Sequence, residues 1–297
     1  MPKTIVMTGV SSGIGRTAAE SLAKRGWRVI GGDCNLVPLH GVETRPLDLG
    51  DLDNVKAFAH GLEGLRLDAL SLNAGVQGYD VKARTAQGFE LAFGVNHLAH
   101  YLLARLLMPQ IAAGGRLVFT TSGTHDPAER SPIPPPRHAN AEWMAWPERD
   151  PELDRHADKA GLRAYSSSKL CNILTARAFA AGNDVHIRGV RVFAYDPGLT
   201  PGTELIRRGP FLVRRLFWPF LSAIQPFSRG INSLADAGRG LADLCDGTET
   251  GDLVYCSNRR GKLKWVQPSA LALDDDLGAK LWRGQRGDGR FIGGLAL

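Results

Sequence analysis

The sequence predicts an α/β fold, in which a parallel sheet carries helices on both faces. Short apolar runs alternate with longer helical stretches along the 297 residues, and this alternation is typical of parallel strands joined by helical crossovers. A glycine-rich turn links the first strand to the first helix, and a carboxylate ends the second strand. An α/β chain of this length is commonly one domain, and its 43% of hydrophobic residues can fill a large core.

Seven strands are expected, with helices between them. The strands are predicted at residues 3–7, 28–32, 42–46, 68–73, 116–122, 185–195 and 252–257, and the helical stretches include residues 16–25, 89–112 and 162–181. Asp51 is predicted to cap the N-terminus of a helix after the third strand. The acidic run 274–276 indicates the first turn of a short helix that ends near Trp282.

The turn after the first strand has the composition of a dinucleotide site. It reads Thr8-Gly-Val-Ser-Ser-Gly-Ile-Gly15 between a strand and a helix, the order in which such sites occur. The first glycine permits a tight turn, the second lets the backbone approach a pyrophosphate, and the third lets helix and strand pack closely. Free N–H groups at the helix N-terminus favour the phosphates. The candidate residues are Gly9, Ser11, Ser12, Gly13, Ile14 and Gly15. The alternative is a loop whose glycines serve only for turning.

Asp33 ends the second strand, 18 residues after Gly15. A carboxylate there accepts hydrogen bonds from the adenosine ribose hydroxyls and repels a 2′-phosphate. Like charges about 4 Å apart cost on the order of 4 kcal/mol at intermediate dielectric. NAD is therefore the predicted cofactor. The alternative is that Asp33 only caps a loop.

A candidate catalytic set follows further along the chain. Tyr165 and Lys169 lie four residues apart, so a helix places both side chains on one face. The lysine ammonium is expected to lower the tyrosine pKa from about 10 towards the range of a general acid–base. Ser122 can polarise a carbonyl, and Asn96 can hold a proton-relay water. Tyr-x-x-x-Lys alone is a weak motif, and it indicates a catalytic site only together with the residues upstream of it.

Six motifs together resemble the short-chain dehydrogenase/reductase family over about residues 3–256. They are Thr8-Gly-x-x-x-Gly-x-Gly15, Asn73-Ala74-Gly75, Asn96, Ser122, Tyr165-x-x-x-Lys169 and Pro197-Gly198. The resemblance implies a Rossmann-type, doubly wound sheet of seven parallel strands in one domain, residues 1–297. It also implies that Tyr165 is the acid–base, Lys169 binds the nicotinamide ribose, Ser122 holds the substrate oxygen and Asn96 anchors the relay.

The same resemblance implies further cofactor contacts. Asp48 and Leu49 match the place where the family holds the adenine, and Asn73, Ala74 and Gly75 match the floor of the cofactor site. Pro197, Gly198 and Thr200 complete the expected set. NADP-using relatives commonly carry arginine one position after the strand-ending residue, where this chain has Cys34.

Two segments set this chain apart within the family. An inserted, proline-rich segment of about residues 125–161 separates Ser122 from Tyr165, and it contains Trp143 and Trp146. Long loops of this kind are usually functional or disordered. The insertion is expected to be a substrate lid. The alternatives are a surface that binds a partner protein and a loop without a function of its own. The second segment, about residues 199–227, is expected to cover the substrate.

These segments supply the candidate substrate residues Thr124, Trp143, Trp146, Leu199, Phe211 and Phe217. The insertion, the string Tyr165-Ser-Ser-Ser-Lys169-Leu-Cys-Asn172 and the stretch Leu216-Phe-Trp-Pro-Phe220 resemble the light-dependent protochlorophyllide reductase branch, and the retinol dehydrogenase branch is also close. Asp33 departs from a branch that uses NADPH, and Leu199 stands where that branch has cysteine. A C-terminal extension of about residues 258–297 follows.

The charge and the cysteines of the chain limit the classes of binding partner and the cellular compartment that we expect. The net charge of +6 comes from scattered basic residues with no nucleic-acid module, so no nucleic-acid partner is expected. The four cysteines have no metal-ligand or disulfide spacing, so no metal and a cytoplasmic location are expected. No apolar run reaches 18 residues and the first strand leaves no room for a signal peptide, which leaves only peripheral membrane contact. Monomer and homodimer both stay open.

Three functions are consistent with the sequence. The first is an NAD-dependent oxidoreductase for the alcohol or ketone of a bulky hydrophobic molecule, aromatic or polycyclic. The second is a reductase of a conjugated C=C bond, in which Tyr165 protonates carbon. The third is a catalytically silent NAD-binding regulator, against which the intact Ser-Tyr-Lys set argues.

Overall fold

One sheet of eight strands forms the centre of the molecule. A computed structural model describes residues 2–78, 80–202 and 231–286. The strands are β1 (Thr4–Thr8), β2 (Arg28–Asp33), β3 (Val42–Pro46), β4 (Leu67–Leu72), β5 (Ile111–Thr120), β6 (Arg191–Asp196), β7 (Tyr255–Arg259) and β8 (Lys262–Trp265). Their order across the sheet is β3-β2-β1-β4-β5-β6-β7-β8. The α/β class predicted from the alternating pattern is confirmed.

The seven predicted strands all pair in parallel, and the structure adds an eighth strand that was not predicted. Strands β1 to β7 pair in parallel, but β8 pairs antiparallel with β7. The two are joined by Arg260 and Gly261, which both have positive φ, 57° and 74°. Two residues in this conformation make the tight hairpin turn that matches the twist of antiparallel strands.

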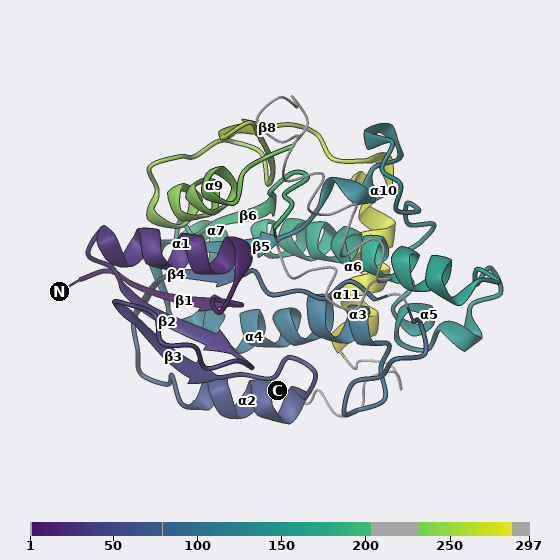
Figure 1. Ribbon diagram of the computed structural model, residues 1–297, viewed down its shortest axis with the longest axis horizontal. Helices are drawn as coiled ribbons and strands as arrows, with labels where there is room; N and C mark the ends of the chain where they lie inside the picture. The colour runs from purple at the N-terminus through teal and green to yellow at the C-terminus, as the bar shows by residue number, and fades with distance from the viewer. Residues whose placement is uncertain (1, 79, 203–230, 287–297) are drawn as a thin grey trace.

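Helices cover both faces of the sheet (Figure 1). They are α1 (Gly13–Lys24), α2 (Leu52–His60), α3 (Leu91–Phe93), α4 (Ala99–Leu107), α5 (Ala141–Ala145), α6 (Ala157–Ala180), α7 (Asn183–Ile187), α9 (Leu234–Asp246), α10 (Ala270–Leu273) and α11 (Asp275–Arg286). Helices α1 and α9 pack together on one face, and α4 and α6 pack on the strands of the other. Asp51 caps α2 as predicted, accepting a hydrogen bond from the Asp53 N–H.

Two expected boundaries differ from the structure. The strand predicted at residues 185–195 begins only at Arg191, because Asn183–Ile187 forms α7. Asp184 in the first turn favours that helix. Gly189, with φ of 62°, lies in the turn between α7 and β6. The helix predicted at residues 89–112 is divided into α3, a π-helical turn over Gly94–Leu98, and α4.

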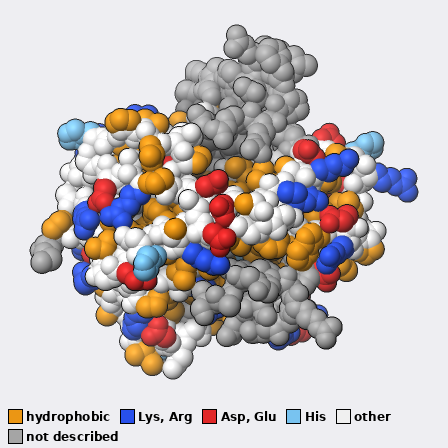
Figure 2. Space-filling view, turned by 90° about the horizontal axis from the view of Figure 1, so that it is seen from below, with side chains coloured by type: hydrophobic (Ala, Val, Ile, Leu, Met, Phe, Trp, Pro, Cys, Tyr) orange, Lys and Arg blue, Asp and Glu red, His pale blue; other side chains and the backbone are white. Residues whose placement is uncertain are grey.

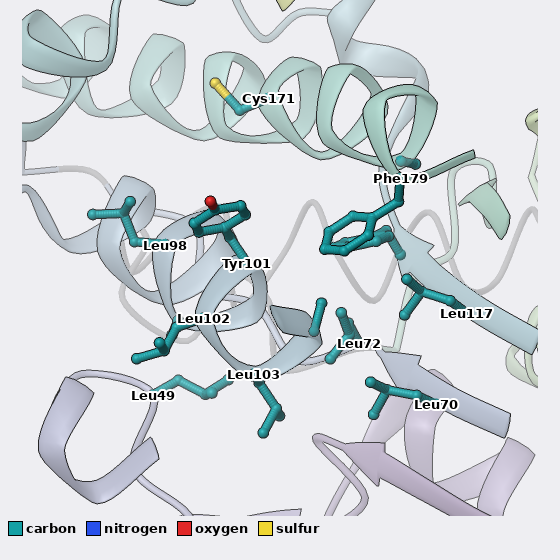
Figure 3. Close-up of a cluster of buried hydrophobic side chains, with 14 of the residues drawn as sticks. Leu49, Leu70, Leu72, Leu98, Tyr101, Leu102, Leu103, Leu117, Cys171 and Phe179 are labelled. Atoms are coloured by element: carbon teal, nitrogen blue, oxygen red, sulfur yellow. The ribbon is translucent and has the colours of Figure 1, made fainter. Parts of the chain in front are cut away.

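The strand pleat divides the apolar side chains between two cores. In β1, Ile5 and Met7 face α1 and α9, whereas Val6 faces the opposite side, as the two-residue period of a strand requires. Figure 3 shows the larger core, to which α4 contributes Tyr101 and Leu102, β4 contributes Leu70 and α6 contributes Phe179. These cores fix the strand ends relative to α6, the helix that carries the candidate acid–base.

The proline-rich insertion is folded onto the body of the molecule. Ser166 Oγ of α6 donates to the Pro134 carbonyl oxygen at 2.5 Å, and Arg163 also donates to the Pro135 carbonyl. The Trp146 ring lies 5.5 Å from the Phe89 ring, centroid to centroid. The insertion therefore packs against the N-terminal half of α6 and the start of α3.

The C-terminal helix covers α4 and α6. It begins at Asp275 within the predicted acidic run and continues four residues beyond Trp282. The Trp282 ring packs edge-on against Tyr101 at 5.4 Å and Phe179 at 5.2 Å, centroid to centroid. Residues distant in sequence thus close the larger core.

Charged side chains are mixed on the surface. Figure 2 shows Lys and Arg interspersed with Asp and Glu over the described part of that face. Several arginines are paired with carboxylates, including Arg25 with Asp243 at 2.7 Å and Arg84 with Glu148 at 3.0 Å. Among the helices described, none has the length and apolar character needed to cross a membrane.

Candidate active site

A cleft opens where the strand order reverses. Strands β2 and β3 lie on one side of β1, and β4 to β8 lie on the other, and ligands of open α/β sheets bind at the carboxyl ends of the strands at such a switch point. Fifteen of the predicted site residues line this one cleft: Gly9, Ser11, Ser12, Gly13, Ile14, Gly15, Asp33, Asp48, Leu49, Asn73, Ala74, Gly75, Tyr165, Lys169 and Pro197.

The glycine-rich loop has the geometry that a pyrophosphate needs. Ser12 is the N-cap of α1, its side chain makes no capping hydrogen bond, and the first turn has no acidic residue. The N–H groups of that turn are therefore available to an anion. A Cβ on Gly15 would lie 2.0 Å from the Gly9 carbonyl oxygen, and Gly9 itself has φ of 74°. Only glycine permits this approach at either position.

Asn73 ties the end of β4 to this loop. Its Nδ2 donates to the carbonyl oxygens of Thr8 at 3.2 Å and Gly9 at 3.4 Å. The N–H groups of Asn73 and Ala74 both donate to Thr8 Oγ1, at 2.9 and 3.0 Å. The floor of the cleft is thus fixed to both strands that flank the switch point.

Asp33 presents an oriented carboxylate to the cleft. It is 7% exposed, and its oxygens accept from the Ser11 and Asn35 N–H groups, each at 2.9 Å. A carboxylate has about four acceptor positions, so both oxygens keep capacity for ribose hydroxyls. Asp48 is fixed similarly, since its Oδ1 accepts from the Gly50 N–H at 2.7 Å.

Tyr165 and Lys169 lie one turn apart on α6, both almost fully buried. The Lys169 Nζ donates to the Thr120 carbonyl oxygen at 3.1 Å and lies 5.7 Å from the centre of the Tyr165 ring. Ser122 follows β5, and its Oγ accepts from the Thr124 N–H at 3.3 Å. Three elements, β5, the turn after it and α6, therefore position these side chains.

Burial sets the protonation of both groups. Burial raises the pKa of Tyr165 above its ordinary value of 10.0, a hydrogen bond with Ser122 lowers it, and the charge of Asp196 raises it. Burial also lowers the pKa of Lys169 from 10.5 to about 8. The expected net lowering of the Tyr165 pKa is wrong for this structure, because burial has the largest effect and raises it. Tyr165 is a protonated phenol at neutral pH.

Asn96 is completely buried in the π-helical turn. Its Oδ1 accepts from the Val76 N–H at 2.7 Å, and its Nδ2 donates to the Val76 carbonyl oxygen at 2.9 Å and to Ser168 Oγ at 3.0 Å. A Cβ on Gly75 would lie 3.3 Å from Asn96 Oδ1 and 3.4 Å from Lys169 Nζ. The side chain thus joins the end of β4 to α6, and only Oδ1 retains acceptor capacity for a relay water.

The remaining predicted residues lie around the cleft or outside it. Thr200 Oγ1 hydrogen-bonds the Pro197 carbonyl oxygen at 3.2 Å, Gly198 has φ of 68°, and Leu199 is half-exposed. The Thr124 hydroxyl is buried with no hydrogen-bond partner among the described residues. Phe211 and Phe217, like most of the segment 199–227, lie outside the described residues.

The two tryptophans of the insertion do not line the cleft around Tyr165. Trp143 packs against His138 at 5.2 Å between ring centroids and lines a separate cavity with Leu277 and Lys280 of α11. Trp146 packs on Phe89, and the Arg149 guanidinium lies 4.6 Å from the centre of its ring. Neither ring lines the cleft that contains Tyr165, and their contact with a substrate stays a prediction.

The sequence reasoning missed several residues that line the cleft. They are Gly32, Cys34, Asn35, Leu47, Gly50, Val76, Gln77, Leu91, Val95, Thr120 and Thr121. Most directly follow a strand or end one, and Leu91 and Val95 lie one helical turn apart just before Asn96. Their position at or directly after the end of a predicted strand was the feature of the sequence that could have identified them.

Asp196 was also missed. It ends β6 just before Pro197 and is 1% exposed. Its carboxylate accepts from the Ser257 hydroxyl at 2.8 Å, the Gly198 N–H at 2.9 Å and the Tyr255 hydroxyl at 3.2 Å. This buried charge adds to the cost of forming a phenolate at Tyr165.

Replacing Lys169 with methionine should stabilise the folded protein at neutral pH. The lowered pKa of Lys169 corresponds to a charge-burial cost of about 3 kcal/mol, and the lost hydrogen bond offsets about 1 kcal/mol. The Thr120 carbonyl oxygen keeps a second donor, Asn172 Nδ2 at 3.2 Å. We expect urea unfolding at about pH 7 to show a gain on the order of 2 kcal/mol.

That gain should shrink as pH rises. Between pH 8 and 10.5 the unfolded wild-type chain binds more protons than the folded chain at Lys169, so the wild-type stability rises with pH. The methionine variant lacks this titration. A difference that stays constant between about pH 7 and about pH 10 would contradict the depressed lysine pKa.

Comparison with known proteins gives a consistent set of relatives. Residues 3–129 match the family model described as short chain dehydrogenase. Protochlorophyllide reductase A of Oryza sativa subsp. japonica is 31% identical over 94% of this chain and 78% of its own length. Retinol dehydrogenase 12 of Homo sapiens is 32% identical over 94% of this chain and 84% of its own.

Solved structures share the fold. An uncharacterized protein from Mycobacterium Paratuberculosis has a TM-score of 0.68 at 27% identity, covering 97% of this chain and 94% of that one. The 3-ketoacyl-(acyl-carrier-protein) reductase from Brucella melitensis, complexed with NADH, has a TM-score of 0.59 at 21% identity, covering 88% and 98%. The second likeness concerns the fold alone.

Proposed function

The chain is an NAD(P)-dependent oxidoreductase that belongs to the short-chain dehydrogenase/reductase family, and from this premise we propose that it uses NAD to interconvert the alcohol and ketone of a bulky hydrophobic molecule. The observation that carries the proposal is a single cleft in which Tyr165 and Lys169 meet the glycine-rich loop and Asp33. A nucleotide on the loop and on Asp33 would direct its nicotinamide towards the tyrosine.

The preference for NAD rests on Asp33. The carboxylate is fixed by two N–H groups at the point that the adenosine ribose would reach, and a 2′-phosphate there would face it. Cys34, the next residue, offers no positive charge to a phosphate.

The reaction needs a hydride and a proton. Bound NAD(H) supplies or accepts the hydride. For a ketone, Tyr165 donates its phenolic proton to the carbonyl oxygen while the carbonyl carbon gains the hydride, so the C=O bond becomes CH–OH. Ser122 orients the carbonyl oxygen, and the Lys169 ammonium stabilises the phenolate that remains. Because burial raises its pKa, Tyr165 carries at neutral pH the proton that this step uses.

A hydrophobic substrate is supported by the cleft wall and by the relatives. Leu91, Val95 and Val76 are apolar residues of the cleft wall, and relatives are named for protochlorophyllide and retinol. The buried, unpartnered Thr124 hydroxyl suits a polar group of the substrate. We assign the covering role to the segment 199–227 rather than to Trp143 and Trp146.

Reduction of a conjugated C=C bond is the second candidate. Several relatives at about 30% identity, including that of Avena sativa, are named protochlorophyllide reductase. The same site would perform it if the hydride went to one alkene carbon and the Tyr165 proton to the other.

A matched substrate series tests both candidates. We expect kcat/KM for NADH oxidation to rise roughly tenfold or more from a small acyclic ketone to two- and three-ring ketones, because each added apolar group contributes binding energy of about 1–3 kcal/mol. Equal turnover of small and large ketones would contradict the bulky substrate. An enone whose product keeps its carbonyl and loses its C=C bond would select the second candidate.

A further inference from the structure

A buried amide links the candidate catalytic lysine to two neighbouring elements. Asn172 lies on α6, three residues after Lys169, and is fully buried. Its Nδ2 donates to the carbonyl oxygens of Asn96 at 3.0 Å and Thr120 at 3.2 Å. Its Oδ1 accepts from His97 Nδ1, with the two atoms 3.0 Å apart. Both N–H bonds and the oxygen of this amide thus have defined partners.

The position of the Lys169 ammonium depends on one of those carbonyl groups. Lys169 Nζ donates to the same Thr120 carbonyl oxygen at 3.1 Å. Among the residues that the structure describes, no carboxylate forms an ion pair with Lys169. The Thr120 peptide ends β5, and the N–H on its other side, that of Thr121, donates to the Tyr195 carbonyl oxygen of β6 at 2.7 Å. Asn172 and β6 therefore both hold the peptide to which Lys169 donates.

Two backbone carbonyl oxygens fix which way the Asn172 amide faces. With the amide reversed, its oxygen would face both of them, leaving buried groups unpaired. Burial lowers the pKa of His97, so the neutral ring has one N–H, and it pairs with the Asn172 oxygen in the tautomer that carries the proton on Nδ1. His97 also stacks on Phe93, 5.3 Å between ring centroids, and its Nε2 lies 2.7 Å from the side-chain amide of the fully buried Gln285 on α11.

We propose that Asn172 is a positioning residue for Lys169, with its amide oriented by the Asn96 and Thr120 carbonyl oxygens and its own oxygen paired with His97. Asn172 touches neither cofactor nor substrate. It fixes the Thr120 carbonyl oxygen and so the direction in which Lys169 points into the cleft. The inference rests on the proposed function, because it matters only if Lys169 binds the nicotinamide ribose and supports Tyr165.

A double-mutant cycle on cofactor affinity tests the proposal. Asn172→Leu keeps the size of the side chain and removes its donors, and Lys169→Met removes the lysine charge. NADH affinity is measured by fluorescence titration for the wild type, both single variants and the double variant. We expect Asn172→Leu to weaken NADH binding roughly tenfold in the wild type and less than about twofold in the Lys169→Met background.

Cys171→Ala is the matched control. Cys171 precedes Asn172 on α6, is equally buried and belongs to the apolar core, as Figure 3 shows. Its substitution removes packing but no group that touches Thr120. We expect it to lower thermal stability and to leave NADH affinity unchanged in both backgrounds. A purely structural role for Asn172 would give the same pattern, and that result would overturn the proposal.

A second variant covers the case in which Asn172→Leu does not fold. His97→Phe preserves an aromatic ring against Phe93 and removes the donor to Asn172 Oδ1. We expect a smaller loss of NADH affinity than for Asn172→Leu, again absent from the Lys169→Met background. Equal losses in both backgrounds would overturn the proposal. If the wild type itself binds no NADH, the proposed function fails instead, so the two failures are distinct.

Discussion

Replacing Tyr165 with phenylalanine should abolish ketone reduction while leaving cofactor binding nearly intact. The variant loses only the hydroxyl, because the ring remains in its buried place on α6. General acid catalysis contributes about 10²–10⁴-fold, and we expect kcat to fall by that factor. Steady-state kinetics on the best ketone of the series, with NADH titration of the same variant, measures both quantities.

Ser122→Ala is the companion variant. It removes the hydroxyl that hydrogen-bonds Tyr165 and should lower kcat more than cofactor affinity, by less than the tyrosine variant does. If Tyr165→Phe kept more than about a tenth of the activity, the expected contribution of the acid would be missing and Thr124 would be the nearest alternative. His125 is a poor donor, because its Nδ1 lies 2.8 Å from the Ser122 carbonyl oxygen and its Nε2 accepts from the Ser269 N–H at 3.2 Å.

NAD(H) should bind far more tightly than NADP(H), because Asp33 would face the additional phosphate. Repulsion on the order of 4 kcal/mol before screening corresponds to a preference of several hundredfold. Fluorescence titration of NADH and NADPH under identical salt measures the ratio. Equal affinities, or tighter binding of NADPH, would contradict the assignment of NAD.

Two variants separate charge from loop structure in this prediction. The Asp33 carboxylate also accepts from the Ser11 and Asn35 N–H groups, so Asp33→Asn is preferred to alanine as the first test, since it removes charge and keeps a side-chain oxygen. Adding Cys34→Arg should move the preference further towards NADP. Asp48→Asn, at a carboxylate in the same cleft, is the matched control and should change the ratio little.

Local chemistry made much of this molecule predictable. The strand at residues 4–8, the glycine-rich turn and α1 follow one another within about 20 residues, and each is specified by neighbours in the chain. The spacing of Tyr165 and Lys169 places both on one face of a helix wherever that helix lies. The strand predicted at residues 185–195 was placed too early, because a short apolar run is ambiguous between strand and helix by periodicity alone. The short strand β8, which pairs only with β7, was not predicted.

By itself the sequence determined the α/β architecture, the family resemblance and the identity of the residues that meet in the cleft, because periodicity and turn chemistry act between near neighbours. The tertiary structure alone decided the raised pKa of Tyr165 and the lowered pKa of Lys169, since desolvation depends on every segment that packs around a group. It also decided that Trp143 lines a cavity beside α11 rather than the cleft, and that Asn172 joins Asn96 to Thr120. Contacts between segments so far apart in the chain exist only once the core has closed.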